Sequence, residues 1–333
     1  MTATGIEAIL PALESAGLVE PGAAVDCTPL SGGVSSDILL VRPAGRDAFV
    51  VKRALAKLKV KDDWFADPGR NRAEQDWFAY VGRLAPAAVP RLLYRGPDWF
   101  AMEYLGAGFV TWKSELLAGQ TDHARARAAG GLLGRIHRAS WGDAAVRALF
   151  ATAENFHALR IEPYLLTTGR RLPALRRLFE TEAERLGATA FALVHGDYSP
   201  KNLLAGEGRL VAVDAEVAWF GDPAFDSAFL LTHLHLKAAL YPAQRDAFLD
   251  LASTYWTAYR AAARPQADAA LEQRVARLLL MIMLARVHGK SPVEYLAPAQ
   301  QALVTRFVNR LLPAAPAPLA EIASAWSNAL ASA

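Results

Sequence analysis

The sequence predicts an α+β protein with strands mainly in its first hundred residues and a mainly helical remainder. Apolar, strand-like runs occur at 37–41, 49–52 and 99–105. From about residue 106 the apolar residues recur with helical spacing, apart from a short strand-rich stretch near residue 200. A chain of 333 residues can bury one large or two medium cores. We therefore expect two parts, residues 1–104 and 105–333.

Composition narrows the class of protein. An apolar content of 53% is incompatible with disorder, and a single cysteine, Cys27, rules out an internal disulfide framework and a cysteine-based zinc site. No basic segment precedes an apolar core at the start, so we expect a cytoplasmic protein without a signal peptide. The apolar run 278–285 is too short to span a bilayer. The net charge of +3, without clustered Lys and Arg, predicts no nucleic-acid binding.

The stretch LVHGDYSPKNLLAGEGRLVAVDAEVAWFGDPAFDSAF, residues 193–229, holds the chemically informative groups. It offers one candidate base, Asp197, an amide oxygen at Asn202, and carboxylates at Asp214 and Glu216. Mg²⁺ is a hard ion that prefers carboxylate, carbonyl and water oxygens. Metal-dependent phosphoryl transfer requires such ligands and a group that orients the attacking hydroxyl.

The local pattern brings these groups together. Apolar residues 203–204 and 210–213 predict two strands, and Ala-Gly-Glu-Gly at 205–208 is a strong hairpin turn signal. The hairpin would place Asn202, before its first strand, near Asp214, after its second. The alternative is a solvated turn followed by a surface hairpin.

On these residues, the segment resembles the aminoglycoside phosphotransferase and choline kinase group, small-molecule relatives of protein kinases. The resemblance implies a bilobal protein-kinase-like fold, with an antiparallel sheet plus helix in the N-lobe and a larger, mainly helical C-lobe. It also implies ATP and Mg²⁺ as cofactors. Asp197 would accept the acceptor hydroxyl proton, Asn202 and Asp214 would hold Mg²⁺, and Asp226, with His195, would support the catalytic loop that includes Asn202.

The segment differs from the signalling protein kinases at two motifs. Those enzymes carry HRD and DFG sequences and an activation loop. Gly196 stands here in place of the Arg, and Ala215-Glu216 in place of Phe-Gly. The differences favour a constitutive metabolic or detoxifying kinase with a small-molecule acceptor.

The first hundred residues offer candidate nucleotide contacts. Leu30 to Ser36 is a candidate phosphate loop, in which Gly32, Gly33 and Ser35 are the predicted contacts. Lys52 ends an apolar strand, as the phosphate-contacting Lys of the family does.

A second set of residues would position the lysine and the adenine. A helix around 72–78 places Glu74 one turn from Trp77 and Phe78, so Glu74 is the expected partner of Lys52. Asp76 and Glu103 are its rivals. The run 99–105 resembles the strand and hinge that contact adenine, with Glu103 and Tyr104 as the candidate contacts.

A narrower similarity is to the 5-methylthioribose kinase family. It rests on Val51-Lys52-Arg53-Ala54-Leu55, Trp64, Arg72-Ala73-Glu74 and Ala285-Arg286-Val287-His288-Gly289. Two departures point to a relative with another substrate. Arg286 alone stands where that family carries a pair of Arg, and Asn202 stands where a small polar residue is expected.

Several residues admit two interpretations. Glu216 is a metal ligand beside Asp214 or supports the site from behind it. Trp219 lines the substrate pocket or seals a loop against a helix. Lys201 contacts a phosphate or is solvated. The histidines are expected to pack rather than to bind metal: His137, His233 and His235.

Charge in the predicted acceptor region favours a neutral or anionic acceptor. Between residues 233 and 290 there are eight Lys and Arg and four Asp and Glu. Because a polycation requires a field of carboxylates, an aminoglycoside-modifying kinase is the less favoured alternative. Arg286 is the expected acceptor contact. A catalytically silent nucleotide-binding regulator of the same fold is the other alternative, and the sequence is compatible with a homodimer.

Overall fold

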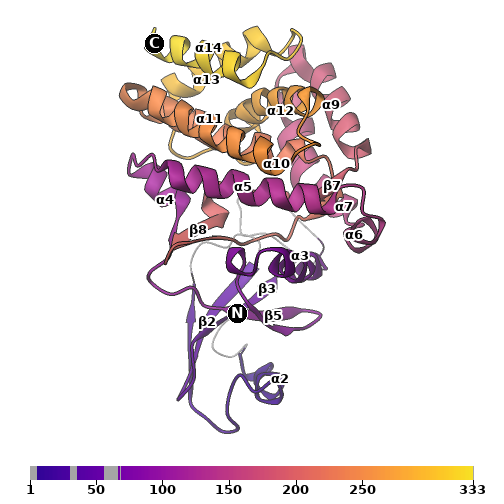
Figure 1. The fold of residues 1–333 in the computed structure, drawn as a ribbon, viewed down its shortest axis with the longest axis vertical. Helices are drawn as coiled ribbons and strands as arrows, with labels where there is room; N and C mark the ends of the chain where they lie inside the picture. Colours follow the sequence, from indigo (N-terminus) through magenta and orange to yellow (C-terminus); the bar gives the residue numbers. More distant parts are fainter. Residues whose placement is uncertain (1–5, 31–35, 56–66, 68, 333) are drawn as a thin grey trace. The chain divides into compact units, whose positions relative to one another are not determined.

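The computed structural model describes residues 6–30, 36–55, 67 and 69–332. The chain forms two compact units, Met1–Phe109 and Val110–Ala333, and Figure 1 traces both by colour along the sequence. The first unit contains an antiparallel sheet and the second is mainly helical, so the predicted α+β class is confirmed.

The sheet of the first unit has five antiparallel strands. In spatial order they are β1 (Val25–Pro29), β2 (Ser36–Pro43), β3 (Phe49–Ala54), β5 (Trp99–Glu103) and β4 (Leu92–Arg95). Lys52 of the central strand β3 lies opposite Ile38 on one side and Phe100 on the other. The lysine therefore projects from the middle of the sheet.

Both faces of this sheet are covered, as the alternation of strand side chains requires. One face packs against helix α2 (Leu10–Ser15), whose Leu13 joins a core with Val41, Phe49 and Val51. The other face packs against α3 (Arg70–Leu84), with Phe78 edge-on to Phe100 at a centroid distance of 6.1 Å. A short 3-10 turn, Pro86–Ala88, follows α3.

The second unit surrounds a few short strands with helices. Its helices are α4 (Trp112–Leu117), α5 (His123–Ser140), α6 (Ala144–Leu149), α7 (Ala153–Phe156), α8 (Thr167–Arg171), α9 (Arg176–Ala188), α10 (Ala224–Leu240), α11 (Arg245–Ala262), α12 (Ala269–His288), α13 (Pro298–Leu311) and α14 (Leu319–Ala331). A π-helix, His157–Leu166, joins α7 to α8. The shorter 3-10 turns are Pro173–Leu175, Pro200–Asn202 and Pro242–Gln244.

Two glycines set the distance between α5 and α11, which run side by side (Figure 1). A Cβ on Gly130 would lie 2.3 Å from the Tyr255 carbonyl oxygen, and one on Gly134 would lie 2.6 Å from that of Tyr259. Only glycine permits this approach. It brings the last turn of α5 against the tyrosines of α11.

The predicted hairpin is present. Strand β8 (Leu203–Gly206) pairs with β9 (Arg209–Ala212) and with β6 (Val110–Thr111). The turn residues Glu207 and Gly208 both have positive φ, 51° and 71°, as a tight two-residue hairpin turn requires.

A separate strand pair, β7 (Ala192–Val194) with β10 (Trp219–Gly221), leads into the HGD sequence. Along the described chain, every helix is too short or too polar to cross a membrane.

Candidate active site

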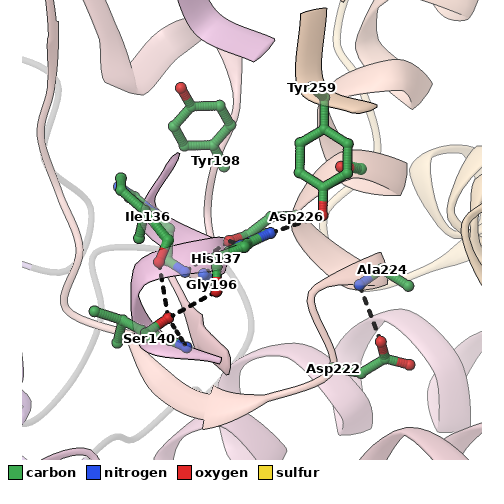
Figure 2. Close-up of polar contacts among 12 residues, drawn as sticks. Ile136, His137, Ser140, Gly196, Tyr198, Asp222, Ala224, Asp226 and Tyr259 are labelled. Carbon is green, nitrogen blue, oxygen red and sulfur yellow. Dashed lines mark hydrogen bonds and ion pairs between the residues drawn. The ribbon is translucent and has the colours of Figure 1, made fainter. Parts of the chain in front are cut away.

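Asp226 holds the backbone of the HGD sequence in place. It lies in the first turn of α10, is fully buried, and accepts hydrogen bonds from the His195 amide at 2.7 Å and the Gly196 amide at 2.9 Å. Figure 2 shows its carboxylate beside His137 and Gly196. One carboxylate thus receives two consecutive amide groups, which fixes the loop that follows β7.

A histidine and a tyrosine stand behind Asp226. His137 of α5 places Nε2 3.4 Å from Asp226 Oδ2 and Nδ1 2.9 Å from the Tyr259 hydroxyl of α11 (Figure 2). Burial raises the pKa of Tyr259, so its hydroxyl keeps its proton. Because the Asp226 carboxylate can only accept, a neutral His137 ring has its proton on Nε2, and its Nδ1 accepts from the Tyr259 hydroxyl. The Nε2 proton of the histidine then faces the carboxylate.

Gly196 is required by the path of the backbone. Its φ is +78°, and a Cβ there would lie 2.6 Å from the Val217 carbonyl oxygen. The turn therefore brings residue 196 directly against the segment that carries Glu216.

His195 joins the loop to the end of the hairpin. Its Nδ1 accepts a hydrogen bond from the Asp197 amide at 3.1 Å, and its Nε2 lies 3.2 Å from the Val213 carbonyl oxygen. Burial lowers the pKa of His195, which favours the neutral ring with its proton on Nε2. The ring connects Asp197 to the residue that precedes Asp214.

Two cations contact the candidate base. Asp197 Oδ2 lies 3.2 Å from Arg160 Nη2 and 2.9 Å from Lys201 Nζ. Within the described chain, no hydrogen bond or ion pair involves the other oxygen, Oδ1. The carboxylate is therefore oriented through one oxygen and presents the other.

Arg160 reaches the base from the π-helix. Its Nε also donates to the Gly196 carbonyl oxygen. Burial alone would lower the pKa of Arg160, but Asp197, Tyr164, Glu216 and Asp214 raise it above its ordinary value. The guanidinium remains charged beside the base. The sequence analysis missed this residue, for which the signal was an arginine within the mainly apolar run from Leu159 to Leu166.

The oxygen-bearing residues of the hairpin converge. The Asn202 side-chain amide donates to the Asp197 carbonyl oxygen at 3.0 Å, which directs its own Oδ1 away from that carbonyl. The Val213 amide donates to the Asn202 carbonyl oxygen at 3.0 Å, so Asp214 lies next to Asn202. Asp214 has φ of +65°, a conformation that non-glycine residues seldom adopt and that clusters at functional sites.

Glu216 follows two residues after Asp214. Its side chain is buried, and its backbone oxygen accepts a hydrogen bond from the Asn155 side-chain Nδ2 at 2.9 Å. Both interpretations, metal ligand and support, agree with that position.

The donor set fits Mg²⁺. Among the described residues, no three or more His, Cys, Asp or Glu side chains are arranged to hold a metal ion. The candidate set is instead an amide oxygen, one neighbouring carboxylate and a second carboxylate two residues on. Mg²⁺ in nucleotide enzymes takes one or two carboxylates and completes its shell with phosphates and water.

In the first unit, the expected lysine–glutamate pair is present. Lys52 Nζ lies 2.9 Å and 2.7 Å from the two Glu74 carboxylate oxygens, and both side chains are buried. Of the rivals, Asp76 pairs with Arg95 and Glu103 accepts a hydrogen bond from the Arg91 amide. The geometry selects Glu74.

The remaining predicted contacts are placed as follows. Glu103 ends β5 and Tyr104 follows it. Gly32, Gly33 and Ser35 lie outside the described residues.

Trp219 and Arg286 have defined packing partners. Trp219 is buried and stacks on Phe156 at a centroid distance of 4.3 Å. This packing agrees with the interpretation that Trp219 seals a loop against a helix. Arg286 Nη1 donates to the Tyr164 hydroxyl at 3.2 Å and to the Ser291 hydroxyl at 2.9 Å. Arg286 thereby lies one aromatic ring away from Arg160.

Comparison with known sequences gives a family match. The sequence profile described as the phosphotransferase enzyme family matches residues 26–265. The chain is 24% identical to methylthioribose kinase of Pectobacterium carotovorum subsp. carotovorum, over 78% of this chain and 74% of that protein. It is also 24% identical to methylthioribose kinase of Yersinia enterocolitica, over 71% and 66%.

Solved structures share the fold. Amicoumacin kinase in complex with AMP-PNP and Ca²⁺ superposes with a TM-score of 0.56 at 15% identity, covering 96% of this chain and 97% of that one. A choline/ethanolamine kinase family protein from Mesorhizobium loti gives a TM-score of 0.52 at 18% identity, covering 100% and 94%. The predicted bilobal protein-kinase-like architecture is confirmed.

Proposed function

The chain belongs to the phosphotransferase enzyme family and is a small-molecule kinase; we propose that it uses ATP and Mg²⁺ to phosphorylate a hydroxyl of a neutral or anionic sugar or alcohol. The observation that carries this proposal is the carboxylate of Asp197. Two cations hold one of its oxygens and leave the other for a ligand, and the Asn202 side chain is hydrogen-bonded to the Asp197 backbone.

Asp197 acts on the acceptor. Its Oδ1 accepts a hydrogen bond from the attacking hydroxyl, which orients the hydroxyl oxygen and receives its proton as the phosphoryl group is transferred. Arg160 and Lys201 hold the carboxylate in one orientation, so little reorganisation is needed at the moment of transfer.

Asn202 and Asp214 are the residues that would hold Mg²⁺, with Glu216 as a further ligand or as their support. When bound, the ion neutralises charge on the phosphate oxygens. The relative solved with AMP-PNP and Ca²⁺ supports a nucleotide and a divalent cation for this family.

The nucleotide contacts are assigned to the first unit. Lys52 contacts the phosphates, and Glu74 keeps its ammonium group in position. Gly32, Gly33 and Ser35 are the residues that the sequence predicts as further phosphate contacts. Glu103 and Tyr104 supply backbone contacts to adenine.

A sugar acceptor is supported by the relatives named methylthioribose kinase. Arg286 is the assigned basic contact, and the excess of cations between residues 233 and 290 disfavours a polycationic aminoglycoside. Asp197, Asn202 and Asp214 together disfavour a catalytically silent regulator. A cytoplasmic location and a homodimer remain predictions.

The proposal is tested by ADP release over a panel of small sugars and alcohols, with Asp197→Asn as the blank. We expect at least one acceptor to stimulate ADP release in the wild type and not in the blank. Equal ADP release by both proteins on every acceptor would contradict the assignment of the base.

A further inference from the structure

Lys237 is a buried cation without a counterion. It lies in the last turn of α10, its side chain is 2% exposed, and its Nζ lies 3.2 Å from the centre of the Tyr295 ring. Across the described residues it has no hydrogen bond and no ion pair. A charge buried in this way is costly unless something of opposite charge compensates it.

Two further donors beside Lys237 also have no partner. The Tyr295 hydroxyl and Arg286 Nε are both buried and make no hydrogen bond within the described part of the chain. The carboxylate that acts on Lys237, Glu294, forms an ion pair with Lys113 at 2.7 Å. Burial, together with the charges of Lys113 and Arg286, lowers the pKa of Lys237 to about 7, and Glu294 only partly opposes this shift.

His233, one turn earlier on α10, is surrounded by the same excess of positive charge. Burial lowers its pKa well below the usual value, and Arg286, Lys237, Lys201 and Lys113 all lower it further. The charged groups with the largest effect on this ring are thus cations. Because Lys201 also contacts Asp197, the positive region continues to the candidate base.

The geometry of α10 connects the two regions. Asp226, His233 and Lys237 are separated by seven and four residues, so they share one face of the helix. At 1.5 Å per residue, His233 lies about 10 Å along the axis from Asp226.

A second connection runs through the π-helix. The Arg160 guanidinium carbon lies 5.8 Å from the centre of the Tyr164 ring, and the Tyr164 hydroxyl accepts a hydrogen bond from Arg286. The uncompensated cations therefore lie within the reach of a small molecule whose hydroxyl is bound by Asp197.

We propose that the acceptor carries an anionic group, a carboxylate or a phosphate, that binds to Lys237, Arg286 and the Tyr295 hydroxyl. The group would supply the missing counter-charge and the missing hydrogen-bond acceptor together. Several bonds separate it from the hydroxyl that is phosphorylated. The inference rests on the proposed kinase function and narrows its acceptor to the anionic class.

The first test measures anion binding without turnover. With Mg·AMP-PNP at saturation, the Tm of the wild type is followed in sodium sulfate and in sodium chloride of equal ionic strength. The variants are Lys237→Met and Arg286→Met, and Arg260→Met is the control, because Arg260 is half-exposed and lies on α11. Met retains the length and the apolar stem of the lysine, which favours folding of the variant.

Sulfate stabilises most proteins non-specifically, so the comparison among variants is decisive. We expect an additional increase in Tm with sulfate for the wild type and Arg260→Met, and its loss in Lys237→Met and Arg286→Met. An equal sulfate effect in all four proteins would overturn the inference.

The second test measures turnover on matched acceptors. Ribose 5-phosphate is compared with ribose, gluconate with glucose, and glucosamine serves as a cationic acceptor. We expect the anionic member of a pair to have the higher kcat/KM, and Lys237→Met to lower it about 10²-fold while sparing the neutral member. A preference for ribose 5-phosphate over ribose would identify the anionic group as a phosphate, and a preference for gluconate over glucose would identify it as a carboxylate.

The two tests separate the inference from the proposed function. Preference for a neutral or cationic acceptor, unaffected by Lys237→Met, would overturn the inference while the kinase function stands. Absence of turnover on all acceptors would count against the function, and the sulfate comparison would then decide the inference alone.

Discussion

The surroundings of Asp197 and those of Lys237 are both buried and charged, yet they differ in charge balance. Asp197 has two cationic partners, and Asp226 behind it receives two amides and faces a histidine. Lys237 has an aromatic ring and further cations around it. The first region is complete without a ligand, as preorganised catalysis requires. The second becomes balanced only when a ligand adds negative charge.

The largest effect on turnover is expected from a substitution of Asp197. Asp197→Asn should lower kcat on the order of 10²–10⁴-fold, because the amide cannot accept the hydroxyl proton. Mg·ATP affinity should be nearly unchanged, since the carboxylate acts on the acceptor. Steady-state kinetics and isothermal titration measure the two quantities, and near-normal turnover would refute the role of Asp197.

Asp214→Ala should separate metal binding from proton transfer. We expect both slower turnover and Mg·ATP binding weakened on the order of 10²-fold, because the carboxylate is the assigned metal ligand. Raising the Mg²⁺ concentration should restore part of the activity of this variant and none of that of Asp197→Asn. Unchanged Mg·ATP affinity in the titration would assign the metal to another residue.

Arg160→Met and Lys201→Met compare the two cations that hold the base. Arg160 is buried, so its loss breaks a buried pair and should cost on the order of 3–5 kcal/mol of unfolding free energy as well as kcat. Lys201 is about half-exposed, and its loss should change kcat only about threefold. Denaturant unfolding and kinetics on both variants test this order, and a larger loss from Lys201→Met would reverse the assignment.

The smallest expected effect is a pH dependence of kcat/KM that arises from Lys237. The folded-state pKa of Lys237, about 7, lies below the ordinary value of 10.5, so the lysine loses its charge as pH rises through 7. The kcat/KM of an anionic acceptor should therefore decrease severalfold above about pH 7. Lys113, Arg286 and Glu294 are the charged groups that act on Lys237.

The same pKa shift has the opposite consequence for folding. Between about pH 7 and 10.5 the unfolded chain binds a proton at Lys237 that the folded chain lacks, so stability should increase with pH in this range. Lys237→Met should flatten the pH profile of kcat/KM and the pH profile of the unfolding free energy. An unchanged slope in this variant would contradict the assignment.

The sequence could predict what depends on local spacing. The hairpin that brings Asn202 to Asp214 lies within a dozen residues, and the partner of Lys52 follows from helix periodicity. Arg160 could not be assigned, because its contact with Asp197 depends on how the π-helix packs against the HGD turn. The Lys237 region could not be predicted either, because α10, α12 and the chain after α12 meet only in the folded unit.

One helix carries a residue of both regions, since α10 has Asp226 in its first turn and Lys237 in its last. The two are rigidly coupled, so a substitution that tilts or rotates α10 to admit a new acceptor also displaces the HGD backbone. Arg286 on α12 and Tyr295 beyond it are free of that constraint. Laboratory evolution toward other acceptors should therefore accumulate changes around Arg286 and Tyr295, and leave the core-facing side of α10 almost untouched.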